Sequence, residues 1–496
     1  MTASRHEDHL DFGGNFVQII NGKPAFTKTT RHGINPATLE RMEEVPVATR
    51  DDLHEAVAAA RAAFKQWSQT PYRDRKQAVL AWADTIESYS TEFRDLLIAE
   101  QGKPLPQAEI ETASTVAWMR GMAGIELKDE VIEDSHARKI ITRHTPLGVV
   151  AAIVPWNFPL MLTTAKVAPA LLTGNVIIVK PSSCPVTLLS INTPNWPFTP
   201  YGCLKLVELA QLFFPPGVVQ SLSGNDDLGP WITSHSGIDK ISFTGSTATG
   251  KLVMRSASES LKRVTLELGG NDPAIVFPDV DIEETAKQVA TFAFLNSGQV
   301  CLNLKRIYVH NSIYTQFRDA VVSAVKAFVI GNGSKEGVSH GPLQNSLQYS
   351  RVKTFFDDIE TQGWKVAVGG KMDAKATKGY YVVPTVIDNP PEDSRIVVEE
   401  PFGPIVPLLS WETEDEVIER ANNTTMGLGA SVWSANTAQA EKVARRLEAG
   451  TVWINNHFDI SPVAPFGGHK ESGIGIEWGS NGLKEFCNVQ TLFSYK

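Results

Sequence analysis

The chain has 496 residues, of which 42% are hydrophobic and 20% are charged. This composition is typical of a folded globular protein of two or three domains and excludes a disordered or fibrous chain. The formal net charge of −9 gives no overall basic field, so no nucleic-acid partner is expected.

The N-terminal residues and the cysteine content do not indicate secretion. The first ten residues lack an apolar core, and the apolar stretch 149–154 is too short to span a bilayer. No membrane association is therefore expected. Four cysteines are too few for a disulfide framework, and no metal-binding spacing is present. We expect a cytoplasmic protein without a metal.

In chain order, hydrophobic periodicity predicts helices over 51–67 and 73–98, followed by strands over 140–143 and 148–154. Strands and helices then alternate, which is typical of βαβ units and a parallel sheet. The alternating segments are strands at 176–179, 218–222, 240–243 and 264–268, and helices at 204–213 and 248–256.

Two further segments complete the predicted organisation. A second α/β block is expected over 269–455, and a final strand over 488–495. That last strand can pair with a neighbouring subunit or form a simple sheet edge, and the pattern alone leaves both alternatives open.

A glycine-rich turn joins a predicted strand to a helix at Phe243–Gly250. Gly245 and Gly250 match the first and last glycines of a dinucleotide fingerprint, although Thr247 replaces the middle one. Glu267 lies 22 residues beyond Gly245, where a Rossmann fold places its ribose-binding acid. A catalytic carboxylate is the alternative, because two glycines that allow close approach of a ligand follow it.

Two other side chains are candidates for chemistry. Cys301 follows a glycine and polar residues, which favours a turn beside a cleft where a thiolate could act. Most single cysteines of large proteins are inert, and the other three have no such context. Asn157, bracketed by Pro155 and Pro159, is a structural cap or an amide donor to an oxyanion.

Six motifs in one order carry a family resemblance. Together they resemble the NAD(P)-dependent, non-acylating aldehyde dehydrogenase superfamily, from about residue 21 to 495. The motifs are Pro155-Trp156-Asn157-Phe158-Pro159, Phe243-Thr244-Gly245-Ser246, Glu267-Leu268-Gly269-Gly270, Gly298-Gln299-Val300-Cys301, Glu400-Pro401-Phe402-Gly403-Pro404 and Pro465-Phe466-Gly467-Gly468.

The resemblance implies a catalytic role for three residues. Cys301 would be the nucleophile, and the Asn157 amide and the Cys301 backbone N–H would hold the oxyanion. Glu267 would activate water to hydrolyse a thioester, which replaces the ribose interpretation based on spacing. A sulfur nucleophile divides one difficult step into two, and partial burial can give a carboxyl group the pKa of a base.

The resemblance also implies a cofactor site for NAD or NADP, and no metal. Gly245 and Ser246 would meet the pyrophosphate, and Lys180 the adenosine ribose. Glu400 would meet the nicotinamide ribose, with Phe402 nearby, and Trp156 would line the cleft.

The family architecture predicts an α/β fold with three parts and a homodimer or homotetramer. A Rossmann-type cofactor domain is expected over 1–123 and 148–266, and an α/β catalytic domain over 267–463. A small β oligomerisation ribbon and C-terminal segment would take 124–147 and 464–496.

One segment departs from the family pattern. Residues 183–196 add fourteen uncharged residues to a connection that usually has about 2–6. The segment is either a real loop beside the adenosine pocket or a translated stretch that the native protein lacks. No acid follows Lys180 at the position that favours NAD, so NADP is also considered. Asn271 and Asp272 depart from the pattern without being expected to touch the chemistry.

Residues of the aldehyde tunnel are predicted by position as Met161, Ala165, Leu302 and His457. Ala165 replaces a bulky aromatic residue of many members, which predicts an entrance wide enough for an aromatic or medium-chain aldehyde. Two rival functions are an acylating dehydrogenase, which would lack Glu267, and a catalytically silent member impaired by the 183–196 insertion.

Overall fold

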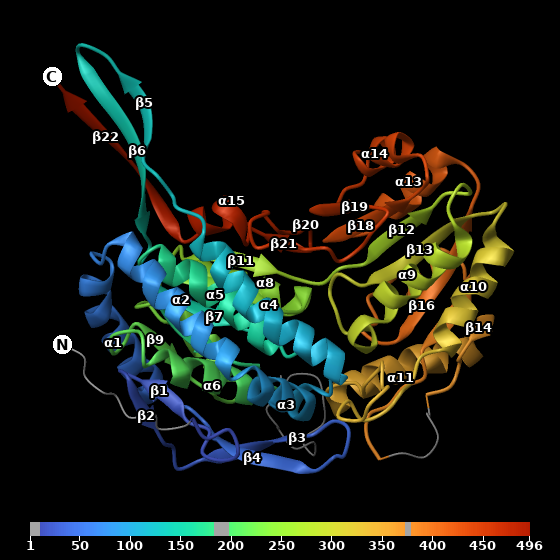
Figure 1. The fold of residues 1–496 in the computed structure, drawn as a ribbon, viewed down its shortest axis with the longest axis horizontal. Helices are drawn as coiled ribbons and strands as arrows, with labels where there is room; N and C mark the ends of the chain where they lie inside the picture. Colours follow the sequence, from blue (N-terminus) through green and yellow to red (C-terminus); the bar gives the residue numbers. More distant parts are fainter. Residues whose placement is uncertain (1–9, 183–197, 373–377) are drawn as a thin grey trace.

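The computed structural model describes residues 10–182, 198–372 and 378–496. The described chain forms an α/β structure with two large sheets, each packed between helices, and a β-ribbon that extends away from the body (Figure 1). The predicted insertion at 183–196 lies outside the described residues. Among those residues, no helix is both long enough and apolar enough to cross a membrane.

The first sheet has a parallel centre with antiparallel strands at its edges. Its order is β2-β1-β9-β8-β7-β10-β11-β21, and the pairs from β9 to β11 are parallel. The predicted alternation of strands and helices is confirmed here. The strands are β1 (Gln18–Ile20), β2 (Lys23–Ala25), β7 (Val149–Ile153), β8 (Val176–Lys180), β9 (Val219–Ser221), β10 (Lys240–Thr244), β11 (Arg263–Glu267) and β21 (Gly473–Ile474).

The helices around this sheet include those predicted at 51–67, 204–213 and 248–256, together with α4, α5 and α7, which the sequence pattern did not predict. The helix expected over 73–98 is two helices that meet at Tyr89, whose φ of −102° and ψ of 21° are not helical. Ser88 Oγ donates to the Thr85 carbonyl, and such competition for backbone groups ends helices. The helices are α1 (Arg50–Trp67), α2 (Tyr72–Ser88), α3 (Ser90–Gln101), α4 (Leu105–Ala123), α5 (Pro159–Leu172), α6 (Tyr201–Ala210), α7 (Leu228–Ser234) and α8 (Thr247–Ser258).

The second sheet has the order β14-β15-β16-β13-β12-β18-β19 and separates two apolar cores. Side chains alternate across a strand, and β12 shows it: Ala274 and Val276 join the core under α9 and α10, whereas Ile275 joins the opposite core. The strands are β12 (Asp272–Val276), β13 (Leu304–His310), β14 (Val366–Val368), β15 (Thr385–Asp388), β16 (Ile405–Trp411), β18 (Gly429–Trp433) and β19 (Thr451–Ile454).

Most of the remaining elements belong to the second unit, whereas the hairpin β3–β4 and helix α15 pack against helices of the first. A short antiparallel pair, β17–β20, and a hairpin, β3–β4, complete the strand pairing. These elements are β3 (Thr30–Ile34), β4 (Arg41–Pro46), β17 (Met426–Gly427), β20 (His469–Lys470), α9 (Ile282–Phe294), η2 (Leu295–Gly298), α10 (Tyr314–Lys326), α11 (Ser346–Thr361), α12 (Arg395–Val398), α13 (Glu414–Asn422), α14 (Thr437–Ala444) and α15 (Gly479–Lys484).

The projecting ribbon contains β5 (Glu130–Asp134), β6 (Arg138–Pro146) and β22 (Cys487–Tyr495). β22 pairs with β6 along its whole length, from Cys487 opposite Pro146 to Tyr495 opposite Arg138. The predicted strand at 488–495 is therefore present, and within one chain it pairs with β6. Figure 1 shows the ribbon standing clear of both sheets.

The chain crosses from the first sheet to the second over a very short distance. β11 ends at Glu267 and β12 begins at Asp272. Residues 268–271 therefore form the whole connection. Functional side chains placed at this crossover lie between the two α/β units, where ligands of such folds usually bind.

Candidate active site

Cys301 lies in a constrained loop between η2 and β13. Asn296, Ser297 and Gly298 all have positive φ, of 49°, 55° and 77°. Ser297 Oγ donates to the Gly341 carbonyl at 2.7 Å. A Cβ at Gly298 would collide with the Gly403 carbonyl, so only glycine allows this approach of the two loops. The loop that carries the thiol is thus fixed from both sides.

The Cys301 side chain is half-buried and lies among acidic groups. Burial raises the pKa of the thiol to about 12. The ammonium of Lys305 acts in the opposite direction, while Glu267, Glu400 and Asp272 add to the increase. The thiol is therefore mostly protonated at neutral pH in the unliganded protein.

Asn157 brings a side-chain amide to the same loop. It follows β7 just before α5 and is buried. Its Nδ2 donates to the Gln299 carbonyl at 3.0 Å, and Asn296 Nδ2 donates to the Asn157 carbonyl at 3.4 Å. A primary amide has two N–H donors, so the bond to Gln299 orients the group and leaves its second N–H available to another acceptor.

Glu267 ends β11 as a buried carboxyl group. Thr244 Oγ1 donates to its Oε2 at 3.1 Å, and no partner among the described residues reaches Oε1. Burial raises the pKa of Glu267 well above its ordinary value, and the neighbouring Glu477 raises it further. The backbone after Glu267 touches the thiol loop, because a Cβ at Gly270 would collide with the Cys301 carbonyl oxygen.

A buried ion pair behind Glu267 escaped the sequence analysis. Lys166 Nζ on α5 binds the Glu477 carboxylate and donates to Ser242 Oγ at 3.1 Å. Ser242 Oγ also donates to Glu477 Oε1 at 3.1 Å. The Lys166 charge lowers the pKa of Glu267, opposing Glu477. A lysine in the otherwise apolar helix α5 was the available signal that a buried partner exists.

The turn predicted to bind phosphate has the expected geometry. Ser246 is the N-cap of α8 and accepts a bond from the Thr249 backbone at 3.2 Å. Ser246 is exposed, which leaves the helix N-terminus open to an anion. A Cβ at Gly245 would lie 2.6 Å from the Phe243 ring, and one at Gly250 would lie 2.5 Å from Leu268. These residues fit a dinucleotide phosphate.

The other predicted cofactor residues are Trp156, Phe402, Glu400 and Lys180. Trp156 and Phe402 meet edge to face, with ring centroids 5.4 Å apart. Glu400 Oε1 accepts from the Gly270 backbone at 3.3 Å, which places its carboxylate at the crossover between the sheets. Lys180 is the last residue of β8, which β7 and β10 separate from β11 in the first sheet. Burial lowers the pKa of Lys180 to about 7.

The four predicted tunnel residues are all buried. Met161 and Ala165 lie on α5 one turn apart. His457 Nε2 binds the Leu302 carbonyl, so these two residues are neighbours beside Cys301. Burial lowers the pKa of His457 to about 3, so it is neutral at physiological pH.

Asp272, for which no chemical role is expected, lies near the site: its charge adds to the raised pKa of Cys301, and its Oδ2 lies 4.0 Å from His457 Nε2. Its own pKa is raised to about 7 by burial. Because Asp272 opens β12 directly after the crossover, the fold carries it to the site. In the described part of the chain, no cluster of three or more metal-ligating side chains occurs.

Comparisons with known proteins match this geometry. The model of the aldehyde dehydrogenase family matches residues 25–492. The chain is 42% identical over 481 residues to the putative aldehyde dehydrogenase FUS7 of Gibberella fujikuroi, covering 97% of this chain and 99% of the relative. It is 41% identical to the aldehyde dehydrogenase LUC3 of Fusarium, with the same coverage.

Solved structures agree closely with the fold. The NAD+ complex of aldehyde dehydrogenase from Bacillus cereus has a TM-score of 0.91 and 36% identity, covering 98% of this chain and 97% of that one. Betaine aldehyde dehydrogenase from Staphylococcus aureus, also with NAD+, has a TM-score of 0.91 and 33% identity, covering 97% and 94%.

Fold and site together define an oxidoreductase that acts on the aldehyde group of its donors. The chain belongs to the aldehyde dehydrogenase family. The predicted fold class is thereby confirmed, because both the paired sheets and the near-complete coverage are those of this family.

Proposed function

We propose that the protein oxidises an aldehyde to the carboxylic acid with NAD+ or NADP+, and that Cys301 is the nucleophile. The observation that carries this proposal is the arrangement around the thiol. The Asn157 amide is held on the loop that carries Cys301 by its bond to the Gln299 carbonyl, and the buried carboxyl group of Glu267 is close enough to raise the pKa of the Cys301 thiol.

In the first step, the Cys301 thiol gives up its proton to water, and the resulting thiolate attacks the aldehyde carbon and forms a C–S bond. The carbonyl π electrons move to oxygen, and Asn157 Nδ2 and the Cys301 backbone N–H stabilise this oxyanion. A bound NAD(P)+ would accept the hydride, so that the C–H bond of the adduct breaks, the C=O bond re-forms and a thioester remains on Cys301. Glu267 then takes a proton from water, whose oxygen attacks the thioester and expels the thiolate with the acid product.

Residues around the first sheet, together with the loop before β16, would hold the cofactor. The backbone at Gly245 and Ser246 would bind the pyrophosphate at the N-terminus of α8. Lys180 and Glu400 would bind the two riboses, and Trp156 and Phe402 would pack beside the nicotinamide. Two similar solved structures contain NAD+, which supports a dinucleotide here.

The substrate pocket would be formed by Met161, Ala165, Leu302 and His457. The small Ala165 side chain favours an aromatic or medium-chain aldehyde. Steady-state kinetics with benzaldehyde, octanal and acetaldehyde test this substrate class. A higher kcat/KM for acetaldehyde than for benzaldehyde would contradict it.

Reduction of NAD+ or NADP+, followed by nicotinamide absorbance, tests the reaction itself. Cys301→Ala is expected to abolish turnover while the fold, measured by circular dichroism, is retained. Cys203→Ala is the matched control, because Cys203 is a buried thiol on α6 outside the site. Unchanged turnover in Cys301→Ala would refute the nucleophile.

A chain that lacks residues 183–196 is measured beside the full chain. Activity in both shows that the segment is compatible with catalysis and identifies the coenzyme and aldehyde class. Activity in the shortened chain alone would show that residues 183–196 impair catalysis in the full chain. Activity in neither supports the alternative of a catalytically silent family member.

We also propose the domain division and assembly that the sequence predicts. Residues 1–123 and 148–266 would form the cofactor domain, 267–463 the catalytic domain, and 124–147 with 464–496 the ribbon and C-terminal segment. The ribbon exposes large apolar side chains, which fits a homodimer or homotetramer. These are Val131, Ile132, Val489, Phe493 and Tyr495.

The ribbon's role in assembly has a direct test. Phe493→Asp is expected to dissociate the oligomer in light scattering, because it places a charge in the apolar face. Thr491→Ser on the same strand is the conservative control. An unchanged mass for Phe493→Asp would refute the ribbon as an assembly surface.

A further inference from the structure

A buried lysine lies directly behind the proposed nucleophile. Lys305 is the second residue of β13, four positions after Cys301, and its side chain is only 4% exposed. Lysine is rarely buried without a partner, because removing an ammonium from water is costly. The contacts of its Nζ therefore indicate what the residue does.

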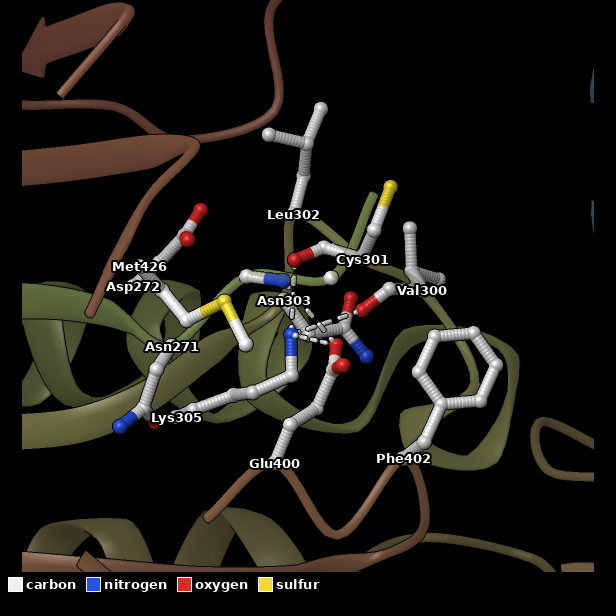
Figure 2. Close-up of polar contacts among 12 residues, drawn as sticks. Asn271, Asp272, Val300, Cys301, Leu302, Asn303, Lys305, Glu400, Phe402 and Met426 are labelled. Carbon is white, nitrogen blue, oxygen red and sulfur yellow. Dashed lines mark hydrogen bonds and ion pairs between the residues drawn. The ribbon is translucent and has the colours of Figure 1, made fainter. Parts of the chain in front are cut away.

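The Lys305 ammonium donates two hydrogen bonds to backbone carbonyls and forms an ion pair with a carboxylate. Nζ donates to the carbonyl oxygen of Cys301 at 2.7 Å and to that of Val300 at 3.0 Å. Glu400 Oε1 lies 3.2 Å away. Figure 2 shows these contacts converging on Nζ, while the Cys301 sulfur points to the other side of the loop. Lys305 thus acts on the backbone of the nucleophile and leaves the thiol face free.

The Val300 carbonyl is covalently linked to one of the proposed oxyanion donors. It belongs to the same peptide group as the Cys301 N–H, which is one of the two proposed oxyanion donors. Because a peptide group is planar, fixing its oxygen also fixes the direction of its N–H. A cation at the oxygen polarises the group and strengthens the N–H as a donor.

Acidic groups surround this peptide and work against a developing negative charge. Glu267, Glu400 and Asp272 all raise the pKa of Cys301, and Lys305 is the cation that lowers it. Asn157 is neutral. Lys305 is therefore the positive charge that offsets these three carboxyl groups at the thiol.

We propose that Lys305 is a positioning residue that orients and polarises the Val300–Cys301 peptide for binding the oxyanion. The inference rests on the proposed function of Cys301 and deepens it. Lys305 touches neither the thiol nor the substrate in this assignment. Its ion pair with Glu400 also connects the oxyanion peptide to the proposed nicotinamide-ribose site.

Two thiol reagents separate this role from a general effect on the thiol. p-Nitrophenyl acetate acylates the Cys301 thiolate through a tetrahedral oxyanion, expels nitrophenolate and needs no coenzyme. Iodoacetamide alkylates the same thiolate by displacing iodide, with no oxyanion. The first rate reports the thiolate and the oxyanion site together, whereas the second reports the thiolate alone. Both rates are measured between pH 6 and 10 and corrected with Cys301→Ala.

Variants of Lys305 separate charge from hydrogen bonding. Lys305→Gln keeps an N–H donor but loses the charge, Lys305→Met loses both, and Lys305→Arg keeps both. Lys205→Met is the matched control, because Lys205 is also buried and its Nζ also binds a backbone carbonyl and a carboxylate, those of Asn15 and Glu208. Lys205 lies on α6, away from Cys301.

We expect Lys305→Gln and Lys305→Met to slow acylation about tenfold more than they slow alkylation, less than the loss of a complete oxyanion donor. Lys305→Arg should stay within about threefold of the parent in both reactions, and Lys205→Met should leave both unchanged. Equal slowing of both reactions, no slowing, or identical results for Gln and Arg would overturn the proposal. A nitrophenolate burst that survives in Cys301→Ala would instead refute the nucleophile.

Glu400→Gln provides a second test that leaves Lys305 in place. Without the opposing carboxylate, the Lys305 charge acts more strongly on the Val300–Cys301 peptide. Acylation by p-nitrophenyl acetate is therefore expected to rise about twofold to threefold relative to alkylation. A fall in that ratio would overturn the proposal even if the Lys305 variants fail to fold.

Discussion

Two buried lysine–carboxylate pairs flank the site, and they differ in what the lysine binds. Lys166 binds only side chains, the Glu477 carboxylate and the Ser242 hydroxyl. Lys305 binds two backbone carbonyls in addition to Glu400. The Glu477 side chain is 3% exposed, whereas that of Glu400 is 16% exposed.

The difference assigns the two pairs to different tasks. The Lys166–Glu477 pair changes the charge around Glu267, since Glu477 raises its pKa and Lys166 lowers it. The Lys305–Glu400 pair instead holds a peptide group of the nucleophile loop. One pair would therefore tune the proposed base, and the other would fix the proposed backbone donor.

The largest expected effect tests the base. Glu267→Gln should lower steady-state turnover by about 10²–10⁴-fold, because no base remains to activate water. The thioester should accumulate, so the first turnover persists as a burst, and mass spectrometry should detect the acyl-enzyme. Glu471→Gln, an exposed acid, is the control. A burst that is lost together with turnover would place Glu267 before the thioester.

The next effect compares the two oxyanion donors. Asn157→Ala should slow acylation by p-nitrophenyl acetate about 10²–10³-fold, because a complete donor is lost. This exceeds the effect expected for Lys305, which only strengthens a donor that remains. Alkylation by iodoacetamide should stay within about threefold of the parent. If alkylation falls as much as acylation, Asn157 supports the thiol and not the oxyanion.

The pH dependence of kcat distinguishes the two lysine–carboxylate pairs through a smaller effect. As the proposed base, Glu267 would act when deprotonated, so turnover is expected to rise with pH through its raised pKa. Glu477→Gln removes a neighbouring negative charge and should lower that pKa, which moves the acidic limb of the kcat profile down by about one pH unit. Lys305→Met should leave this limb in place. A shift to higher pH in Glu477→Gln would contradict the assigned electrostatics.

The smallest difference concerns stability. Lys166→Met should lower the free energy of unfolding by about 3–5 kcal/mol, because it leaves Glu477 charged and enclosed. Lys305→Met should cost about 1–2 kcal/mol less, since the partly exposed Glu400 can be hydrated. Urea unfolding midpoints measure both. Equal losses would mean that the two carboxylates are enclosed to the same degree.

The sequence predicted the parts of the site that belong to local patterns. Ser246 follows from a strand, a glycine turn and a helix. Cys301, Glu267 and Asn157 follow from motifs that resemble a family. The alternation of buried strands with helices likewise predicted the first sheet. Each of these signals is contained in a short, continuous stretch of sequence.

The supporting residues could not be predicted because their partners are distant in the sequence. Lys166 and Glu477 are separated by 311 positions, and no local pattern pairs them. Lys305 and Glu400 meet only because the loops around Gly298 and Gly403 touch. A lysine inside an apolar helix or strand was the signal to use, since burial of its charge requires a partner. The break at Tyr89 depended on serine hydrogen bonds that periodicity does not register.

The protonated state of the resting thiol has a consequence for handling and survival of the enzyme. Peroxide and other electrophiles react with thiolates, and the first product of oxidation is a sulfenic acid. With its pKa raised to about 12, Cys301 presents very little thiolate before ligands bind. Oxidation of Cys301 by peroxide is therefore expected to be slow at neutral pH and to become faster as the pH rises.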